Sequence, residues 1–277
     1  MTVGRLAPTP SGDLHLGNAL AFGAAWLSVR NIGGRLILRI EDLDRGRARD
    51  AIAERQRQDL RWLGLDWDEE VPAQSTRTYT VDRIPTFRCP CTRQSRLYLG
   101  CRCRTKEQDR GAWRFRTAPG VVQFEDRACG KQAFEPEFDP ILMRADGEGA
   151  YPLAVVIDDA RDGVTEVVRG ADLLEATATQ IRLHACLGLV PPSYLHVPVL
   201  LGTDGKKLSK SQGSASIADL RAAGWTAERV WGDLLPVLGI DGAPLSRALL
   251  NPAAIPRGPR VLGADGRIQP AAAGGPG

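Results

Sequence analysis

Hydrophobic residues in the first quarter of the chain fall alternately into short continuous runs and into helical spacing. Residues 3–8 (VGRLAP) and 35–41 (RLILRIE) are apolar runs bounded by Pro or Gly, as expected of buried strands. Residues 16–29 are alanine-rich with helical spacing, and residues 42–65 predict an amphipathic helix ending near Gly64. Strand, helix, strand, helix is the order of an α/β fold with a doubly wound parallel sheet and right-handed crossovers.

The rest of the chain predicts a second half of the same domain. Residues 113–119 and 121–127 predict strands of a connecting region, residues 151–159 (YPLAVVIDD) and 196–202 (HVPVLLG) predict buried strands, and residues 171–189 predict a helix. Hydrophobic periodicity is lost at residues 85–110 and again from residue 251, where Pro, Gly and Ala accumulate. We therefore divide the chain into the following parts: first half of the catalytic domain, 1–84; insertion, 85–110; connecting region, second half and helices after a lysine loop, 111–250; disordered tail, 251–277.

Composition adds limits to this organisation. Hydrophobic residues make up 43% and charged residues 25% of the chain, proportions that are ordinary for a soluble protein. Neither a secretory signal nor an apolar run of roughly 20 residues is present, so we expect a cytoplasmic protein. The net charge of +3 is too small to show a nucleic-acid partner by itself. Three of the five lysines, Lys206, Lys207 and Lys210, nevertheless stand together.

Two loops carry candidate phosphate chemistry. His15 and Gly17 stand where the first strand meets the first helix, and a helix start offers free N–H groups to phosphate. In the other loop, Lys207 and Lys210 of KKLSKS follow the last predicted strand and could neutralise a leaving pyrophosphate. Taken alone, the first motif is also consistent with a capping histidine and the second with a solvated basic loop.

Four of the six cysteines lie in the insertion: Cys89, Cys91, Cys101 and Cys103. Close cysteine pairs in a chain without a secretory signal favour a metal over disulfides. Four thiolates could hold one structural Zn²⁺ ion, although the one-residue spacing within each pair is tight.

The two loops together give a specific resemblance. HLGN at 15–18 and KLSKS at 207–211 resemble the HIGH and KMSKS signatures of class I aminoacyl-tRNA synthetases. Segments including LRIEDLDR, QFEDR and YPLAVVIDDARDGVTEVVRGADLLEAT follow one another as in glutamyl-tRNA synthetases, across residues 4–213. The resemblance implies activation of L-glutamate with ATP and Mg²⁺.

Site residues follow from this resemblance, position by position. Arg5, Arg169 and Tyr151 would hold the glutamate carboxylates, and Glu41 would pair with its ammonium group. The resemblance also puts a glutamate-binding position at Thr9, where the family usually has serine. His15, Lys207 and Lys210 are the candidate catalytic residues, and the positions expected to contact ATP are His15, Gly17, Asn18, Lys207, Ser209 and Lys210. The family's metal pattern includes a tyrosine, so Tyr98 is an alternative zinc ligand.

The chain ends soon after the lysine loop, which leaves little sequence for anticodon reading, and we expect no anticodon-binding domain. In this it is similar to truncated paralogues, the glutamyl-Q tRNA(Asp) synthetases. That resemblance implies a monomer that forms glutamyl-adenylate without tRNA and transfers glutamate to the queuosine base in the anticodon loop of tRNA(Asp). The alternatives are a minimal glutamyl-tRNA synthetase charging the 3′ end of tRNA(Glu), and a non-catalytic RNA-binding remnant.

Overall fold

A computed structural model describes residues 1–43, 50–91, 101–136, 138–208, 215–263 and 267–271. Its centre is a set of parallel strands. β1 pairs with β2 and β2 with β3, while β10 pairs with β9 and with β6, all in parallel. The Thr165 N–H donates to the Val3 carbonyl over 2.9 Å, which places β9 beside β1. These strands are β1 (Val3–Leu6), β2 (Arg35–Leu38), β3 (Glu69–Glu70), β6 (Val122–Asp126), β9 (Glu166–Gly170) and β10 (Ser193–Val197).

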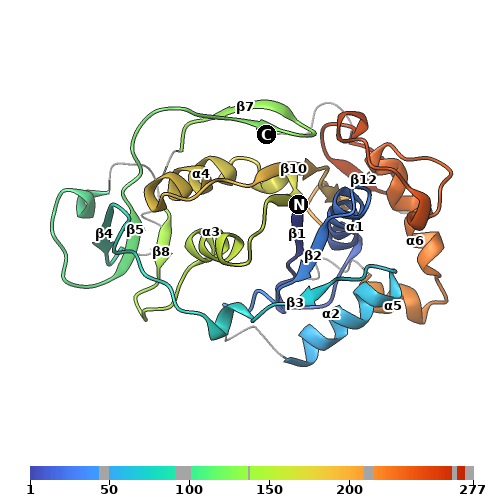
Figure 1. The fold of residues 1–277 in the computed structure, drawn as a ribbon, viewed down its shortest axis with the longest axis horizontal. Coiled ribbons are helices and arrows are strands. Elements are labelled where there is room, and N and C mark those ends of the chain that lie inside the picture. The colour runs from blue at the N-terminus through green and yellow to red at the C-terminus, as the bar shows by residue number, and fades with distance from the viewer. Residues whose placement is uncertain (44–49, 92–100, 137, 209–214, 264–266, 272–277) are drawn as a thin grey trace.

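Helices cover this sheet, as Figure 1 shows. α1 contacts β1, β2, β9 and β10, whereas α3 contacts α4, and α4 contacts β6. Strands alternating with covering helices confirm the predicted doubly wound α/β fold. The helices are α1 (Leu16–Arg30), α2 (Asp50–Trp62), α3 (Tyr151–Arg161), α4 (Ala176–Leu187), α5 (Ile217–Ala222) and α6 (Ala227–Leu234). None of the helices in the described residues is long and apolar enough to cross a membrane.

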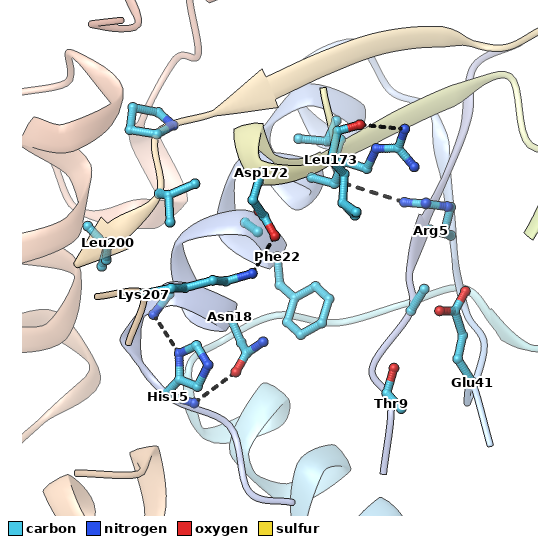
Figure 2. A pocket seen from close by; sticks show the side chains of 18 of the residues that line it. Arg5, Thr9, His15, Asn18, Phe22, Glu41, Asp172, Leu173, Leu200 and Lys207 are labelled. Atoms are coloured by element: carbon cyan, nitrogen blue, oxygen red, sulfur yellow. Dashed lines mark hydrogen bonds and ion pairs between the residues drawn. The ribbon is translucent and has the colours of Figure 1, made fainter. Parts of the chain in front are cut away.

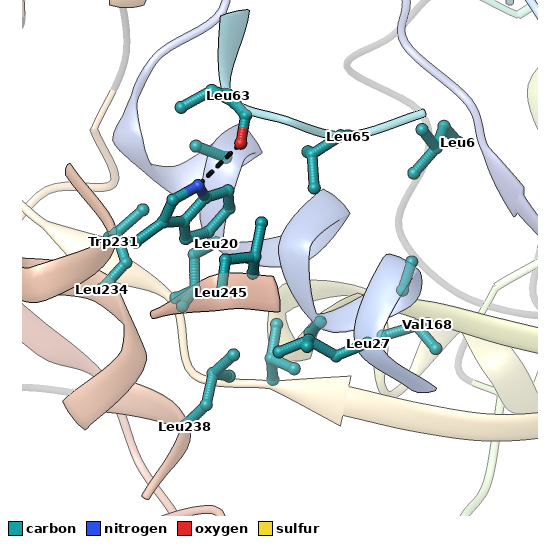
Figure 3. Packing of buried hydrophobic residues seen from close by; sticks show 14 of the residues in the cluster. Leu6, Leu20, Leu27, Leu63, Leu65, Val168, Trp231, Leu234, Leu238 and Leu245 are labelled. Atoms are coloured by element: carbon teal, nitrogen blue, oxygen red, sulfur yellow. Dashed lines mark hydrogen bonds between the residues drawn. The ribbon is translucent and has the colours of Figure 1, made fainter. Parts of the chain in front are cut away.

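The largest hydrophobic core joins the N-terminal half to the C-terminal helices (Figure 3). The Trp231 ring of α6 packs against α1, and its indole N–H donates to the Leu63 carbonyl over 2.7 Å. A Cβ at Gly23 would lie 2.5 Å from this ring, so α1 and α6 approach closely only because position 23 is glycine. The helices that follow the lysine loop are therefore fixed to the same core as the first strand.

A second, antiparallel sheet stands beside this core. In it β5 pairs with both β4 and β8, so the predicted insertion shares one sheet with the connecting region. The antiparallel strand β7 extends the parallel sheet beyond β6. These elements are β4 (Thr86–Cys89), β5 (Ala112–Phe115), β7 (Gly130–Phe134) and β8 (Ile141–Met143).

The prediction of a strand at YPLAVVIDD was wrong, because these residues begin helix α3. Pro152 lies in the first helical turn, where the missing N–H costs no helix hydrogen bond. Asp158 and Asp159 near the end of this helix are also buried. They form ion pairs with Arg77 and Arg39, respectively. A continuous apolar run does not by itself separate a buried helix from a buried strand.

Residues 251–263 and 267–271 also differ from the expected disordered tail, whereas residues 264–266 and 272–277 of that tail lie outside the described residues. β12 (Arg260–Leu262) pairs in parallel with β11 (Leu200–Leu201), and β13 (Ile268–Pro270) pairs antiparallel with β12. Val261 and Ile268 flank a segment containing Gly and Asp, which is a hairpin signal within a composition otherwise typical of disorder. Pairing with β11 gives these short strands the partner that isolated strands lack.

Candidate active site

A cavity of about 310 Å³ opens where the central parallel strands end (Figure 2). Arg5 lies on β1, Glu41 follows β2 and Arg169 lies on β9, so three adjacent strands each contribute one charged side chain. This edge of a doubly wound sheet is where such folds bind ligands. Nine of the predicted site residues line the cavity: Arg5, Thr9, His15, Gly17, Asn18, Glu41, Tyr151, Arg169 and Lys207. Ser209 and Lys210 lie outside the described residues.

His15 closes one end of the cavity as the N-cap of α1. Its Nδ1 accepts from the Gly17 N–H over 3.1 Å, and the Asn18 Oδ1 accepts from the His15 N–H over 3.1 Å. A Cβ at Gly17 would lie 3.0 Å from the histidine ring, so any larger residue there would press on that ring. The capping role and the cavity-lining role thus coexist in His15, and the helix start faces the space where phosphate is expected.

The lysine loop reaches the same end of the cavity. Lys207 forms an ion pair with Asp172, which also lines the cavity, just after β9. On the far side of the loop, the Ile217 N–H donates to the Leu14 carbonyl over 2.8 Å, and Ser216 pairs with His15 in a β-bridge. Both ends of the lysine loop therefore lie beside the loop that contains His15. This arrangement would allow His15 and the lysines to contact the same nucleotide.

Arg169 is held so that one of its nitrogen atoms is left for a ligand. Its Nε donates to His196 Nε2 over 3.1 Å, and its Nη2 donates to Thr177 Oγ1 over 2.8 Å. Its Nη1 is buried without a hydrogen-bond partner among the described residues. An unpaired guanidinium N–H at only 6% exposure is costly unless an anion completes it, which favours carboxylate binding here.

Behind Arg169, a histidine and an aspartate fix its position. His196 Nδ1 lies 2.6 Å from Asp126 Oδ2, and both side chains are fully buried. Burial lowers the pKa of His196, with the Arg169 charge acting in the same direction and Asp126 opposing it. Although burial opposes it, the pKa of Asp126 is lowered, chiefly by its hydrogen bond with His196. A neutral His196 then donates from Nδ1 to Asp126 and accepts at Nε2 from Arg169.

The amino-acid end of the cavity contains a buried network of opposite charges. Arg39 is fully buried and donates to Glu41 over 3.1 Å and to Asp159 over 2.6 Å. Arg5 donates to the same Asp159 oxygen over 3.2 Å. Burial raises the pKa of Glu41, although the positive charges of Arg39 and Arg5 oppose the shift. An incoming ammonium group would favour the ionised form of Glu41 and so oppose this shift.

Sequence reasoning missed Arg39, Asp159, Asp126, His196 and the lysine partner Asp172. A signal for Arg39 exists, because it stands two residues before Glu41 in LRIE, on the same side of an extended chain. Asp159 was missed because its helix was interpreted as a strand. A histidine inside the otherwise apolar strand of residues 193–197 is also a signal for a buried polar role.

The four insertion cysteines form a candidate metal centre away from the cavity. Their sulfur atoms all lie within 4.8 Å of one another, with Cys89–Cys101 at 3.7 Å and Cys91–Cys103 at 3.6 Å. Four thiolates about 2.3 Å from a tetrahedral zinc ion stand about 3.8 Å apart, so this donor set fits such an ion. The tight spacing within each pair is thus compatible with the geometry, and the alternative ligand Tyr98 lies outside the described residues.

Comparison with known proteins gives a consistent picture. Residues 1–86 and 101–234 match the family of class I tRNA synthetases for glutamate (E) and glutamine (Q), catalytic domain. The chain is 41% identical to the Glutamyl-Q tRNA(Asp) synthetase of Nitratidesulfovibrio vulgaris across 96% of this chain and 97% of that protein. It is 40% identical to the protein of the same name from Symbiobacterium thermophilum, across 88% of each chain.

A solved structure confirms the fold. The glutamate-tRNA synthetase of Elizabethkingia anophelis superimposes with a TM-score of 0.76 at 23% identity. The superposition covers 92% of this chain and 66% of that synthetase, so this chain spans about two thirds of its length.

Proposed function

This chain belongs to the glutamate and glutamine family of class I tRNA synthetases, and from that membership we propose that it glutamylates queuosine in tRNA(Asp). As a member of this family it is a tRNA ligase. The proposed reaction has two steps. ATP and L-glutamate first form glutamyl-adenylate without RNA, and the glutamyl group then passes to the queuosine base in the anticodon loop.

The first step is supported by the way one cavity, of about 310 Å³, brings the predicted glutamate and ATP residues together. Arg5 and Arg169 are placed to hold carboxylate, and Glu41 is placed to pair with ammonium at the other side. His15 and Lys207 lie at the opposite end, where the triphosphate would lie with Mg²⁺ (Figure 2). An α-carboxylate oxygen attacks the α-phosphorus, the bond to the bridging oxygen breaks, and pyrophosphate leaves with the electron pair. Positioning and charge neutralisation provide the rate acceleration, with Lys207 and Lys210 acting on the departing pyrophosphate.

Relatives along almost the whole chain support the second step. The two curated relatives described above are both named for glutamyl-Q and tRNA(Asp). The local charge is consistent with an RNA partner: residues 85–117 carry nine Arg or Lys side chains and two acidic ones, against a net charge of +3 for the chain. In the transfer, a hydroxyl oxygen of queuosine attacks the acyl carbon, the bond from that carbon to AMP breaks, and the hydroxyl proton passes to the departing phosphate.

We assign zinc to the cysteine centre and a structural role to that zinc. A closed set of four thiolates leaves no coordination position for a substrate. Cys89, Cys91, Cys101 and Cys103 would hold the ion and thereby tie β4 to the segment around residues 101–104. No step of the proposed reaction passes through this ion.

The test is glutamylation with labelled glutamate and ATP of three RNAs: tRNA(Asp) carrying queuosine, the same tRNA lacking it, and tRNA(Glu). The proposal predicts label on the queuosine-bearing tRNA alone. Label on tRNA(Glu) would make the chain a minimal conventional synthetase. An absence of both transfer and pyrophosphate exchange would make it a non-catalytic remnant.

A further inference from the structure

A second cavity, of about 640 Å³, adjoins the first at its amino-acid end. Three residues, Thr9, Glu41 and Tyr151, line both cavities. The remaining wall comes from the antiparallel sheet and its flanks, together with Gln74. We propose that this second cavity receives the acceptor nucleoside of the RNA, with Phe138 as the platform on which its base stacks. The inference rests on the proposed transfer function and locates its acceptor.

The shared residues place the second cavity on the side from which transfer is possible. Glu41 would pair with the ammonium group of glutamate, and the acyl carbon is bonded to the same carbon atom that carries this group. An acceptor arriving past Thr9 and Glu41 therefore approaches the acyl carbon directly. The nucleotide end, at His15 and Lys207, lies away from these two residues in Figure 2 and can remain occupied by AMP.

Two buried polar groups in the wall have unused hydrogen-bonding capacity. Gln74 is 1% exposed, and its Oε1 has no partner among the described residues, while its Nε2 donates to Asp158 over 2.9 Å. Arg114 is 7% exposed, and its Nε likewise lacks a partner within the described part of the chain, while its Nη1 donates to the Asp139 carbonyl over 2.9 Å. Buried polar atoms of this kind are normally completed by a ligand or water, and a base edge offers both donors and acceptors.

Phe138 and Arg144 give this wall the character of an RNA site. Phe138 lines the cavity, and its side chain is 49% exposed. An exposed aromatic ring in this position can stack on a nucleobase. Arg144 pairs with the exposed Asp146 and can reach a phosphate. Both residues belong to or flank the antiparallel sheet whose β4 and β5 strands lie in the basic segment 85–117.

Substitution of Phe138 separates transfer from activation. The Phe138→Ala variant is compared with Phe138→Trp, which keeps an aromatic face, and with Val121→Ala, which changes another exposed apolar residue outside both cavities. Each variant is assayed for RNA-free pyrophosphate exchange and for single-turnover transfer from preformed adenylate to queuosine-bearing tRNA(Asp). Loss of one base–aromatic stack predicts transfer slower by about tenfold in Phe138→Ala, with exchange unchanged and the other two variants near wild type.

Several outcomes would overturn the inference. Wild-type transfer rates in both Phe138→Ala and Arg144→Gln would show that the acceptor lies elsewhere. An equal loss of exchange and transfer in Phe138→Ala would assign the cavity to glutamate binding instead. Failure of the proposed function is visible separately, because the wild-type protein itself would then form adenylate and transfer nothing to the queuosine-bearing tRNA.

Discussion

The cavity at the ends of the parallel strands and the antiparallel sheet that carries the cysteines differ in what holds them together. The cavity is built largely on strands and helices of the large hydrophobic core, and two arginines beside it, Arg5 and Arg39, pair with the buried Asp159. Among the residues that the structure describes, the cysteine cluster has a core of its own with three buried members, Phe87, Cys89 and Cys103. So small a core contributes little stability without a cross-link or a metal. The contrast fits the proposed function if the core carries out activation and the basic sheet contacts the RNA.

The same contrast appears in the charges. Arg5 and Arg39 near the cavity share the buried carboxylate Asp159, whose pKa is lowered by their positive charges although burial opposes the shift. The basic segment 85–117 has far more cations than acids. Paired charges suit a preorganised active site, while surplus cations suit a polyanionic partner.

The largest expected effect comes from removing Arg169, the buried arginine that is proposed to bind a carboxylate of glutamate. Arg169→Met should lower RNA-free pyrophosphate exchange, measured at a glutamate concentration below KM, by about a hundredfold or more, since an unpaired buried charge costs about 3–5 kcal/mol. Arg247→Met, an exposed arginine outside both cavities, is the matched control. An unchanged KM for glutamate in Arg169→Met would remove this residue from the binding site.

A smaller loss is expected from the lysine loop. Lys210→Ala should slow adenylate formation at least about tenfold, because one ammonium group on the leaving pyrophosphate is lost. Lys207→Ala should act in the same direction, and it also removes the ion pair with Asp172. The exposed Lys131 on β7 provides the control substitution Lys131→Ala. A wild-type rate of adenylate formation in Lys210→Ala would contradict the assigned role.

A weaker, pH-dependent effect should distinguish Glu41 from the arginine anchors. Burial raises the pKa of Glu41, so as the pH falls this carboxylate is protonated earlier than an ordinary glutamate and loses its attraction for ammonium. KM for glutamate should therefore rise as the pH falls, and the rise should begin at a higher pH than the ordinary glutamate pKa of about 4.3 would give. In Glu41→Gln the affinity should be lower and this dependence should disappear. Parallel pH profiles for the two proteins would show that another group titrates.

The smallest effect on activation should follow metal removal. Chelation should release about one zinc ion per chain, expose the β4–β5 region to protease, and leave RNA-free exchange within about twofold. Transfer to tRNA should fall, because the basic sheet loses its support. Cys186→Ser, which alters a cysteine outside the cluster, should retain the metal. Loss of exchange upon chelation, with the circular dichroism of the core unchanged, would contradict the purely structural assignment.

Local sequence patterns predicted much of the core, and the resemblance to glutamyl-tRNA synthetases supplied most of the cavity residues. The loop ending in His15 and the run RLILRIE are both formed from residues close in sequence, and the structure has the predicted strands and helix there. Asp126, His196 and Arg169 come together only through pairing of β6, β10 and β9, and no local pattern contains that information. The same holds for the second cavity, whose wall joins Gln74 to Phe138 and Arg144.

The two incorrect predictions have physical reasons of their own. The apolar run of α3 is buried on a helix and not on a strand. Pro152 favoured the strand interpretation, because proline usually interrupts helices, but it lies in the first helical turn, where proline is tolerated. In the tail, composition favoured disorder, but pairing of β12 with the edge of β11 supplied the missing partner. In both cases tertiary contacts outweighed a weak local preference.

The central claim is that this protein activates glutamate without RNA, and the most direct test is ATP–pyrophosphate exchange in the complete absence of RNA. Glutamate, glutamine and aspartate should be compared on the same preparation of the full chain. The structure predicts exchange with glutamate and little with the other two, since glutamine lacks the second carboxylate and aspartate is too short to reach both arginines. Exchange that requires RNA, or that proceeds equally with glutamine, would contradict it.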